Sequence, residues 1–115
     1  TALARGRFME VVARDSLANR ELDNLFIAGA FSLLDVLLGV LMETALAEMH
    51  LPDSISEALV SGTGPYAPFL ELARAGEQPD PAALAAKAES LQLSAEAVNR
   101  AQLEALRFAD SLQVS

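Results

Sequence analysis

The sequence predicts a single all-α domain, a helical bundle of about six to seven helices, and three observations support this prediction. The chain has 115 residues, the size of one domain, and 52% of them are hydrophobic. Ala and Leu are the largest part of these, whereas aromatic residues make up only 5%, a balance that favours helices over sheets. Apolar residues recur every three to four positions along most of the chain, and no segment is convincing as a strand.

The longest apolar segment, LFIAGAFSLLDVLLGVLM (residues 25–42), contains Asp35 as its one ionisable side chain. A helix that is apolar on all sides must be enclosed by other elements or by lipid. The length is close to the roughly 20 apolar residues that cross a bilayer. However, acidic Asp23 and Glu43 flank the segment, and an aspartate at its middle costs about 2.5–3.5 kcal/mol to insert. The sequence therefore predicts a buried central helix and no membrane insertion.

The first two helices are predicted from an apolar side and from residues suited to a helix start. The first ends near Arg14, and its apolar side consists of Leu3, Phe8, Val11 and Val12. Asn19 is suited to cap the second helix, because its side chain can accept a hydrogen bond from a free backbone N–H. This helix then contains the apolar segment as far as about Leu38, where Gly39 either breaks the helix or caps it.

The middle of the chain is predicted to form three shorter helices. The third helix stops before Pro52, and its apolar side consists of Leu41, Ala45, Leu46 and Met49. The fourth begins at Pro52 and Asp53, and its apolar side consists of Ile55, Ala58, Leu59 and Val60. A turn with two Gly and two Pro residues follows at residues 61–68. The fifth helix comes next, around Phe69, Leu70, Leu72 and Ala73.

Two further helices complete the predicted bundle. Asp80 can cap the sixth helix, which extends to about Leu91, and Pro81 is suited to its first position. Ser94 can cap the seventh helix. The apolar side of the seventh includes Val98, Ala101, Ala105 and Phe108, and its outer side carries Glu96, Arg100, Glu104 and Arg107.

The charge and the residue types present exclude several classes of function. Sixteen acidic and eight basic residues give a net charge of −8, which repels nucleic acid, and no basic patch is evident to offset it. The chain has no cysteine, which excludes disulfides and thiolate metal sites and fits a reducing compartment such as the cytoplasm. The first residues, TALARGRF, lack an initiating Met and a signal peptide, so we expect the chain to be a piece of a longer protein.

No grouping of residues typical of an active site is evident, so no catalytic residue, metal or cofactor is predicted. The one histidine, His50, is expected at a helix end in a partly exposed capping role, and a zinc site would need further His or Cys ligands. The acidic residues are scattered, without a spacing that would bring them together on one helix face. The turn SGTGPY (residues 61–66) resembles a phosphate loop only in its glycines, because it lacks the Gly-Lys-Ser/Thr ending that binds phosphate and magnesium.

Polar side chains inside or beside apolar segments need partners. The carboxylate of Asp35 must find a donor, titrate at a higher pH, or face a groove. We expect it to bond a neighbouring helix N-terminus or an arginine, with a contact to a ligand or partner as the alternative. Ser32 is expected to bond a carbonyl one turn earlier, and no histidine lies near enough in sequence to activate it. Tyr66 and Phe69 are expected to be core anchors.

Three segments resemble parts of HDOD domains, the HD-related output domains that are helical relatives of HD phosphohydrolases. They are FIAGAFSLLDVLLG (residues 26–39), the GxGPY turn (62–66) and VNRAQLEALRFADSL (98–112). The resemblance is to the C-terminal part of the domain, most of all in bacterial proteins that carry it behind an EAL domain. It implies that residues 1–115 adopt an HD-like fold, without the N-terminal helices of a full HDOD domain and without an EAL domain.

The same resemblance implies that the metal site of HD enzymes is lost. In those enzymes the corresponding helix reads roughly AGLLHDIG, and its His-Asp pair binds metal. Aligning this with AGAFSLLD (residues 28–35) places Ser32 and Leu33 at the His and Asp positions. Asp35 then falls two residues later, on another face of the helix. The resemblance therefore implies a non-enzymatic regulatory domain, linked through EAL partners to cyclic di-GMP turnover.

The predicted function is regulation of bacterial signal transduction through contact with another domain, another protein or a second copy of the chain. The excess of apolar side chains in so small a chain suggests a covered surface, for which the candidates are Val12, Leu46, Met49 and Val60. The alternative is a residual metal-dependent phosphohydrolase or nucleotide-binding domain that uses carboxylates alone. A packing or dimerisation piece without a switch is a third reading, which the sequence does not separate from the first.

Overall fold

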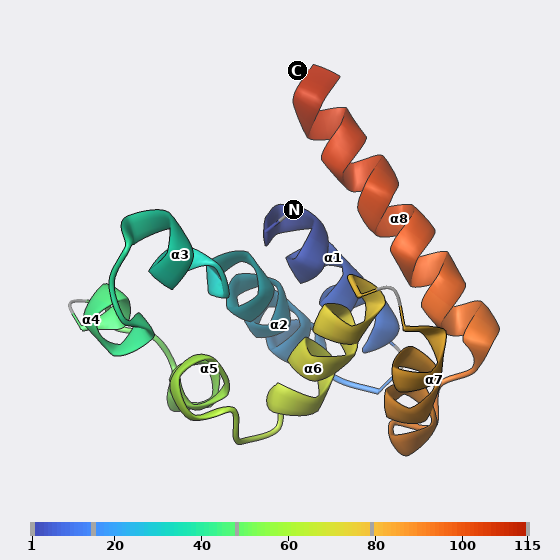
Figure 1. The fold of residues 1–115 in the computed structure, drawn as a ribbon, viewed down its shortest axis with the longest axis horizontal. Helices are drawn as coiled ribbons and strands as arrows, with labels where there is room; N and C mark the ends of the chain where they lie inside the picture. The colour runs from blue at the N-terminus through green and yellow to red at the C-terminus, as the bar shows by residue number, and fades with distance from the viewer. Residues whose placement is uncertain (1, 15, 48, 79, 115) are drawn as a thin grey trace.

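Two helices, α1 (Ala2–Val12) and α2 (Asn19–Phe31), cross near the centre of the molecule, and the other helices surround them (Figure 1). The structure is a computed structural model that describes residues 2–14, 16–47, 49–78 and 80–114. For residues 112–114 it describes the backbone alone. Within all the described residues it consists of helices joined by turns and loops and contains no strand, so the predicted all-α single-domain fold is confirmed.

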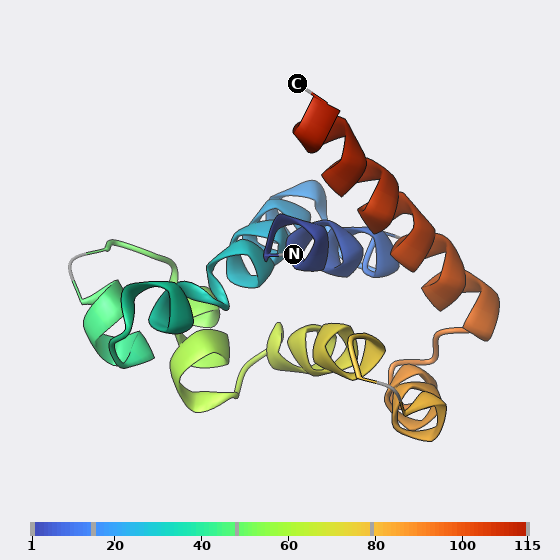
Figure 2. The same cartoon turned by 45° about the horizontal axis from the view of Figure 1, so that its top comes forward.

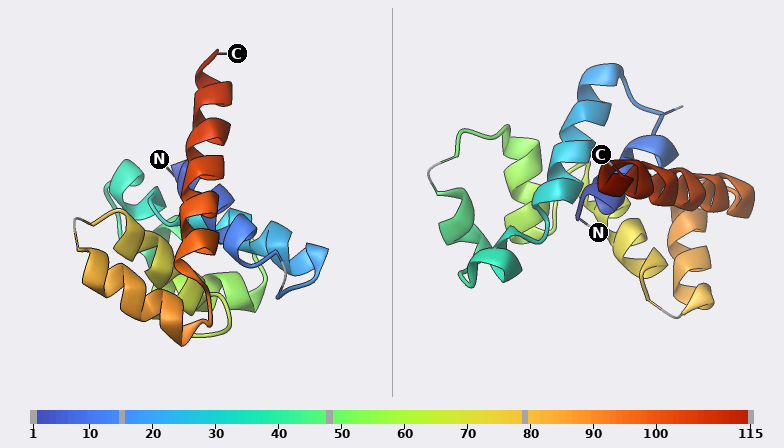
Figure 3. Two further views of the ribbon diagram at one scale, coloured as in Figure 1. Left: turned by 90° about the vertical axis from the view of Figure 1, so that its right-hand side faces the viewer. Right: turned by 90° about the horizontal axis from the view of Figure 1, so that it is seen from above.

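The remaining elements lie on either side of this central pair. In chain order they are α3 (Leu34–Leu38), α4 (Met42–Leu46), α5 (Asp53–Ser56), the π-helix η1 (Glu57–Ser61), α6 (Ala67–Gly76), α7 (Pro81–Ser90) and α8 (Ala95–Val114). Both Figure 1 and Figure 2 show α3, α4 and α5 at one end of the molecule and α7 with the start of α8 at the other. The long α8 packs along α1, and its C-terminal part extends beyond the rest of the fold (Figure 3).

The two central helices approach closely because each has glycine at their crossing. A Cβ atom on Gly29 would lie at 2.4 Å from the Cα of Gly6. A Cβ atom on Gly6 would lie at 2.6 Å from the carbonyl oxygen of Phe26. Both obstacles are backbone atoms, which cannot move aside as the end of a flexible side chain can. Any larger residue at either position would therefore push the two helices apart.

The core lies where α1, α2, the α5–η1 segment, α6 and α8 meet. Its largest fully buried side chains are Met9, Leu25, Ile55, Tyr66, Leu70 and Leu72. Phe69 is also buried, so the prediction that Tyr66 and Phe69 are core anchors is confirmed. Phe108 of α8 contacts the ring of Phe26 edge to face, with 5.9 Å between the centroids, and the Arg7 guanidinium lies over the Phe108 ring. These contacts join α8 to the central pair.

The prediction that the second helix continues, buried, to about Leu38 is wrong beyond Phe31. α2 ends at Phe31, and the Ser32 hydroxyl donates a hydrogen bond to the Gly29 carbonyl at 2.6 Å, as expected for Ser32. After this break α3 packs on α4 rather than in the core. The exposed fractions of Val36, Leu37, Leu38, Val40 and Leu41 are 72%, 72%, 58%, 40% and 75%.

Gly39 ends α3 in the left-handed conformation, with φ of +70°, so of the two predicted alternatives, a helix break or a cap, the structure shows the cap. The chain then turns into α4. In the residues that the structure describes, no helix combines the length and the apolarity that crossing a membrane requires.

Two of the predicted helix caps are confirmed, and one is wrong. A carboxylate oxygen of Asp80 accepts a hydrogen bond from the Ala83 N–H at 3.2 Å, and Pro81 begins α7. The Ser94 hydroxyl accepts one from the Ala97 N–H at 3.1 Å at the start of α8. Asn19 does not cap α2, because the helix already begins there and the capping position is that of Ala18.

The candidate surface residues are also partly corrected. Val12 and Leu46 are buried, because α1 and α4 turn these side chains toward the core. Met49 and Val60 are exposed, as predicted. Glu104, predicted on the outer side of the last helix, forms an ion pair with Arg14, which follows α1. Its Oε2 lies 3.6 Å from Nη2 of Arg14. The main exposed apolar surface is therefore in the second half of α3 and the turn that leads to α4.

Replacing Gly29 with alanine should lower the free energy of unfolding by about 1–3 kcal/mol or more, because the new Cβ would collide with the Gly6 backbone. Urea denaturation followed by circular dichroism measures this change. Gly76→Ala is the matched control, since its Cβ would come within 3.0 Å of the end of the flexible Gln102 side chain and make an ordinary contact with Leu84 at 3.8 Å. Within a helix, alanine is more favourable than glycine by about 1 kcal/mol, so Gly76→Ala should not lower the free energy of unfolding as Gly29→Ala does. A similar loss in both variants would contradict the importance of the crossing.

Candidate functional site

A buried polar network joins α1, α2 and the end of α6. Arg5, on α1, is buried, and its Nη1 donates a hydrogen bond to the Ser32 hydroxyl at 2.7 Å. Its Nε and Nη2 donate to the two carboxylate oxygens of Glu77, at 2.7 Å and 2.5 Å. This two-point contact matches the planar guanidinium to the planar carboxylate. The network thus fixes three segments that are distant in the sequence.

The hydroxyl of Ser32 both donates and accepts a hydrogen bond within this network. It accepts from Arg5 and donates to the Gly29 carbonyl, and its side chain is buried. Leu33 follows in the turn between α2 and α3 and is half-buried. These are the positions that the HDOD resemblance equates with the metal-binding pair of HD enzymes. Here the first holds two helices together, and the second is an aliphatic residue without a metal-binding atom.

Asp35 does not make the contact that the sequence suggested. Because α2 ends early, Asp35 lies in the first turn of α3, where its Oδ1 accepts a hydrogen bond from the N–H of Val36 at 2.9 Å. The side chain is half-exposed rather than enclosed. The expected bond to an arginine or to a neighbouring helix is therefore wrong, and Ser32 and Asp35 have separate hydrogen-bond partners.

No metal centre is formed by the part of the chain that the structure describes: no three His, Cys, Asp or Glu side chains lie close enough to hold an ion. His50 is exposed in the loop between α4 and α5. It does not lie at the end of α4, which finishes at Leu46, so the predicted capping position is wrong.

A second polar cluster surrounds Tyr66, which sequence reasoning placed in the core without identifying its partners. The Tyr66 hydroxyl donates a hydrogen bond to Oε2 of Glu21 at 3.0 Å and accepts one from the Asn24 amide at 3.1 Å. Burial raises the pKa of Tyr66 above its ordinary value of 10.0, and the negative charge of Glu21 adds to this rise. The cluster joins the start of α6 to α2 and has a structural role.

A cleft of about 400 Å³ opens between α1, α6 and α8. Its lining is mostly apolar and includes Phe8, Ala73, Ala105 and Leu106. The charged groups in it, Arg5 and Glu77, already satisfy each other. A ligand entering this cleft would have to break that pair.

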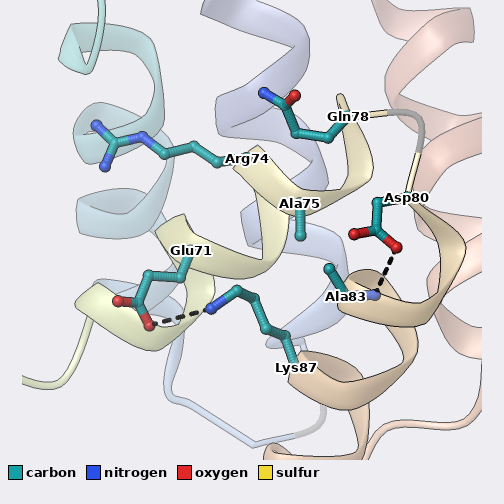
Figure 4. Close-up of a pocket in the computed structure, with 7 residues that line it drawn as sticks. All are labelled: Glu71, Arg74, Ala75, Gln78, Asp80, Ala83 and Lys87. Atoms are coloured by element: carbon teal, nitrogen blue, oxygen red, sulfur yellow. Dashed lines mark hydrogen bonds and ion pairs between the residues drawn. The ribbon is translucent and has the colours of Figure 1, made fainter.

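A second groove, of about 580 Å³, lies between α6 and α7 (Figure 4). Its charged residues are Glu71, Arg74, Asp80 and Lys87. Figure 4 shows Glu71 facing Lys87, at 4.0 Å, while Arg74 points away from both and Asp80 caps α7. The charges are balanced, and both carboxylates have partners. The groove therefore does not bring several charges of one sign together, as a site for an anion or a metal ion would require.

The exposed apolar residues in the second half of α3 and in the turn that leads to α4 are the strongest candidate for a functional surface. We call this segment, residues 36–41 or VLLGVL, the apolar arm. It lies at the end of the molecule away from α8 (Figure 1). Five large apolar side chains in six residues face solvent, whereas monomeric proteins rarely expose such patches without a function. Sequence reasoning missed the exposure, because the same residues would read identically in a core helix.

Comparison with models of known protein families, with curated proteins and with solved structures finds no match to this chain.

The raised pKa of Tyr66 predicts a pH dependence of stability. The folded chain holds the tyrosine proton more tightly than the unfolded chain, so this contribution is complete below about pH 10 and is lost as the pH rises through the folded pKa. The chain has one Tyr and no Trp, so tyrosinate absorbance reports Tyr66 alone. Its titration midpoint should lie above 10 in the folded chain and fall to about 10 in concentrated urea. Identical midpoints would contradict the prediction, and Tyr66→Phe should remove the alkaline loss of stability.

The Arg5 network predicts an asymmetry between two substitutions. Glu77→Gln leaves a buried guanidinium without its counter-charge and should lower the free energy of unfolding by about 3 kcal/mol, the low end for buried pairs because Glu77 is partly exposed. Arg5→Met should cost less, because the partly exposed Glu77 can then turn into water. Urea denaturation measures both variants. A larger loss in Arg5→Met would contradict the burial of Arg5 as the reason.

Proposed function

We propose that this chain is a non-catalytic regulatory domain of the HDOD kind, which acts in bacterial signal transduction by contact with another protein domain. The resemblance of residues 26–39, 62–66 and 98–112 to HDOD domains supports this proposal. By the same resemblance, its setting would be the cytoplasm, in an EAL–HDOD protein linked to cyclic di-GMP turnover.

The single observation that carries the proposal is the apolar arm. Its side chains are exposed on a short segment that contributes little to the core. An enzyme of this size would concentrate polar groups around a cleft, whereas this fold uses its buried polar groups for internal contacts. A contact surface for another protein is the function that such an arrangement suits best.

By the HDOD resemblance, Ser32 and Leu33 stand where HD enzymes carry their metal-binding pair, and the contacts of Ser32 support the proposal that no metal site is present. Ser32 is enclosed by Arg5 and Gly29, and rebuilding a metal ligand there would break the Arg5 network. Catalysis by the remaining carboxylates would need several of them close together. The described carboxylates do not cluster in this way, which favours regulation over residual hydrolysis.

The proposal predicts no metal-dependent hydrolysis of phosphodiesters. The chain is incubated with manganese or magnesium and bis(p-nitrophenyl) phosphate, and release of nitrophenolate is measured. We expect release no faster than in buffer containing the metal alone. Turnover that is lost in Asp35→Asn and retained in the matched exposed variant Asp110→Asn would overturn the proposal in favour of a carboxylate-based phosphohydrolase. The coding sequence before the Thr1 codon tests the link to EAL proteins, since it should then encode an EAL domain.

A further inference from the structure

The net charge of the chain is confined to its middle. Residues 21–73 contain eight acidic residues and no Lys or Arg, whereas the other residues contain eight acidic and eight basic residues. The whole net charge of −8 therefore arises in residues 21–73, and the rest of the chain is neutral. The acidic residues of the middle segment are Glu21, Asp23, Asp35, Glu43, Glu48, Asp53, Glu57 and Glu71.

The apolar arm lies within this acidic part of the chain. Asp35 directly precedes the arm and is half-exposed, and Glu43 in α4 follows it and is exposed. Asp53, at the start of α5, is also exposed. Figures 1 and 2 show α3, α4 and α5 together at one end of the molecule. The exposed apolar side chains are thus accompanied by negative charge and by no positive charge of their own segment.

These acidic groups have no cationic partner in the described residues. The ion pairs among all the residues that the structure describes join Arg5 to Glu77, Arg7 to Glu10, Arg14 to Glu104 and Lys87 to Glu71. None of them involves an acidic residue of α3, α4, α5 or η1. The negative field around the arm is therefore not neutralised internally, and it remains available to a partner.

The sign of this field distinguishes the kinds of surface that could cover the arm. An anionic lipid surface would be repelled by Asp35, Glu43 and Asp53, and a second arm would bring the same charge with it. A surface with apolar side chains at its centre and Lys or Arg around them would bury the arm and also neutralise its acidic neighbours.

We propose that the apolar arm binds a cationic amphipathic segment of a partner protein. The apolar side chains of that segment would cover Val36, Leu37 and Leu41, and its Lys or Arg side chains would face Asp35 and Glu43. This inference rests on the proposed function, because it names the surface and the partner chemistry through which the regulatory domain would act.

The experiment uses the whole chain and a fluorescein-labelled helical peptide of Leu and Lys, with a matched peptide of Leu and Glu. Fluorescence anisotropy at low and high salt gives the dissociation constants. The Lys peptide should bind, less tightly at high salt, and the Glu peptide should not bind. Leu37→Ser combined with Leu41→Ser should raise the dissociation constant of the Lys peptide about tenfold or more.

Matched variants on another face separate this site from general attraction to an acidic protein. Leu103→Ser combined with Leu106→Ser removes two exposed leucines of α8 and should leave binding unchanged. Glu43→Gln should weaken binding severalfold at low salt, whereas Glu89→Gln, the same change in α7, should not. Equal effects of the two leucine pairs, or equal binding of the two peptides, would overturn the proposal.

Two further readouts decide between the possible occupants. Sedimentation velocity measures self-association, and cosedimentation with phosphatidylcholine or phosphatidylglycerol vesicles measures lipid binding. Either result, if lost in the Leu37→Ser and Leu41→Ser double variant, would replace the cationic partner with a second copy or a lipid surface. Failure of peptide binding without phosphodiester turnover would overturn this inference alone. Metal-dependent turnover would overturn the proposed function even if the peptide binds.

Discussion

The contact between Gly6 and Gly29 sets the distance between α1 and α2, and much of the structure depends on it. Because the two backbones touch, Arg5 on α1 comes within hydrogen-bonding distance of Ser32 at the end of α2. The same arginine then reaches Glu77 beyond α6. A wider crossing would separate Arg5 from Ser32 and would leave buried polar groups without partners, which is costly inside a protein. The close approach of Gly6 and Gly29 therefore allows the hydrogen bond between Arg5 and Ser32, and this bond in turn helps to hold α1 against α2.

The Arg5 network defines an arrangement more than it adds stability. Burying the Arg5 guanidinium is costly, and its attraction to the partly exposed Glu77 carboxylate offsets much of this cost without a large surplus. The network favours one arrangement, because the guanidinium on α1 reaches both Ser32 at the end of α2 and Glu77 at the end of α6 in one relative placement of the three helices. The Tyr66 cluster has a similar effect between α2 and α6. The core is thus positioned by a few polar contacts as well as by its apolar volume.

Local features of this fold could be predicted from the sequence, and long-range ones could not. Asp80 and Ser94 act within three residues of their own positions, so turn chemistry was enough to identify them. The bond from Ser32 to Gly29 is equally local. In contrast, Glu77 is 72 residues from Arg5, and no local pattern indicates that pairing. The contact of Ser32 with Arg5 at the end of α2 is also distant in sequence. The exposure of the apolar arm could not be predicted either, because the hydrophobicity of a segment does not indicate whether another helix covers it.

The separation of the apolar arm from the core has an evolutionary consequence. Side chains that face solvent contribute little to the free energy of folding, so substitutions in the arm are filtered weakly for stability. Substitutions at the crossing of α1 and α2, in contrast, are filtered strongly. Selection can therefore act on the two regions almost independently. Descendants of this chain could keep one scaffold, including the Gly39 cap, while the exposed side chains of the arm diversify, and recognition could drift without a loss of foldability.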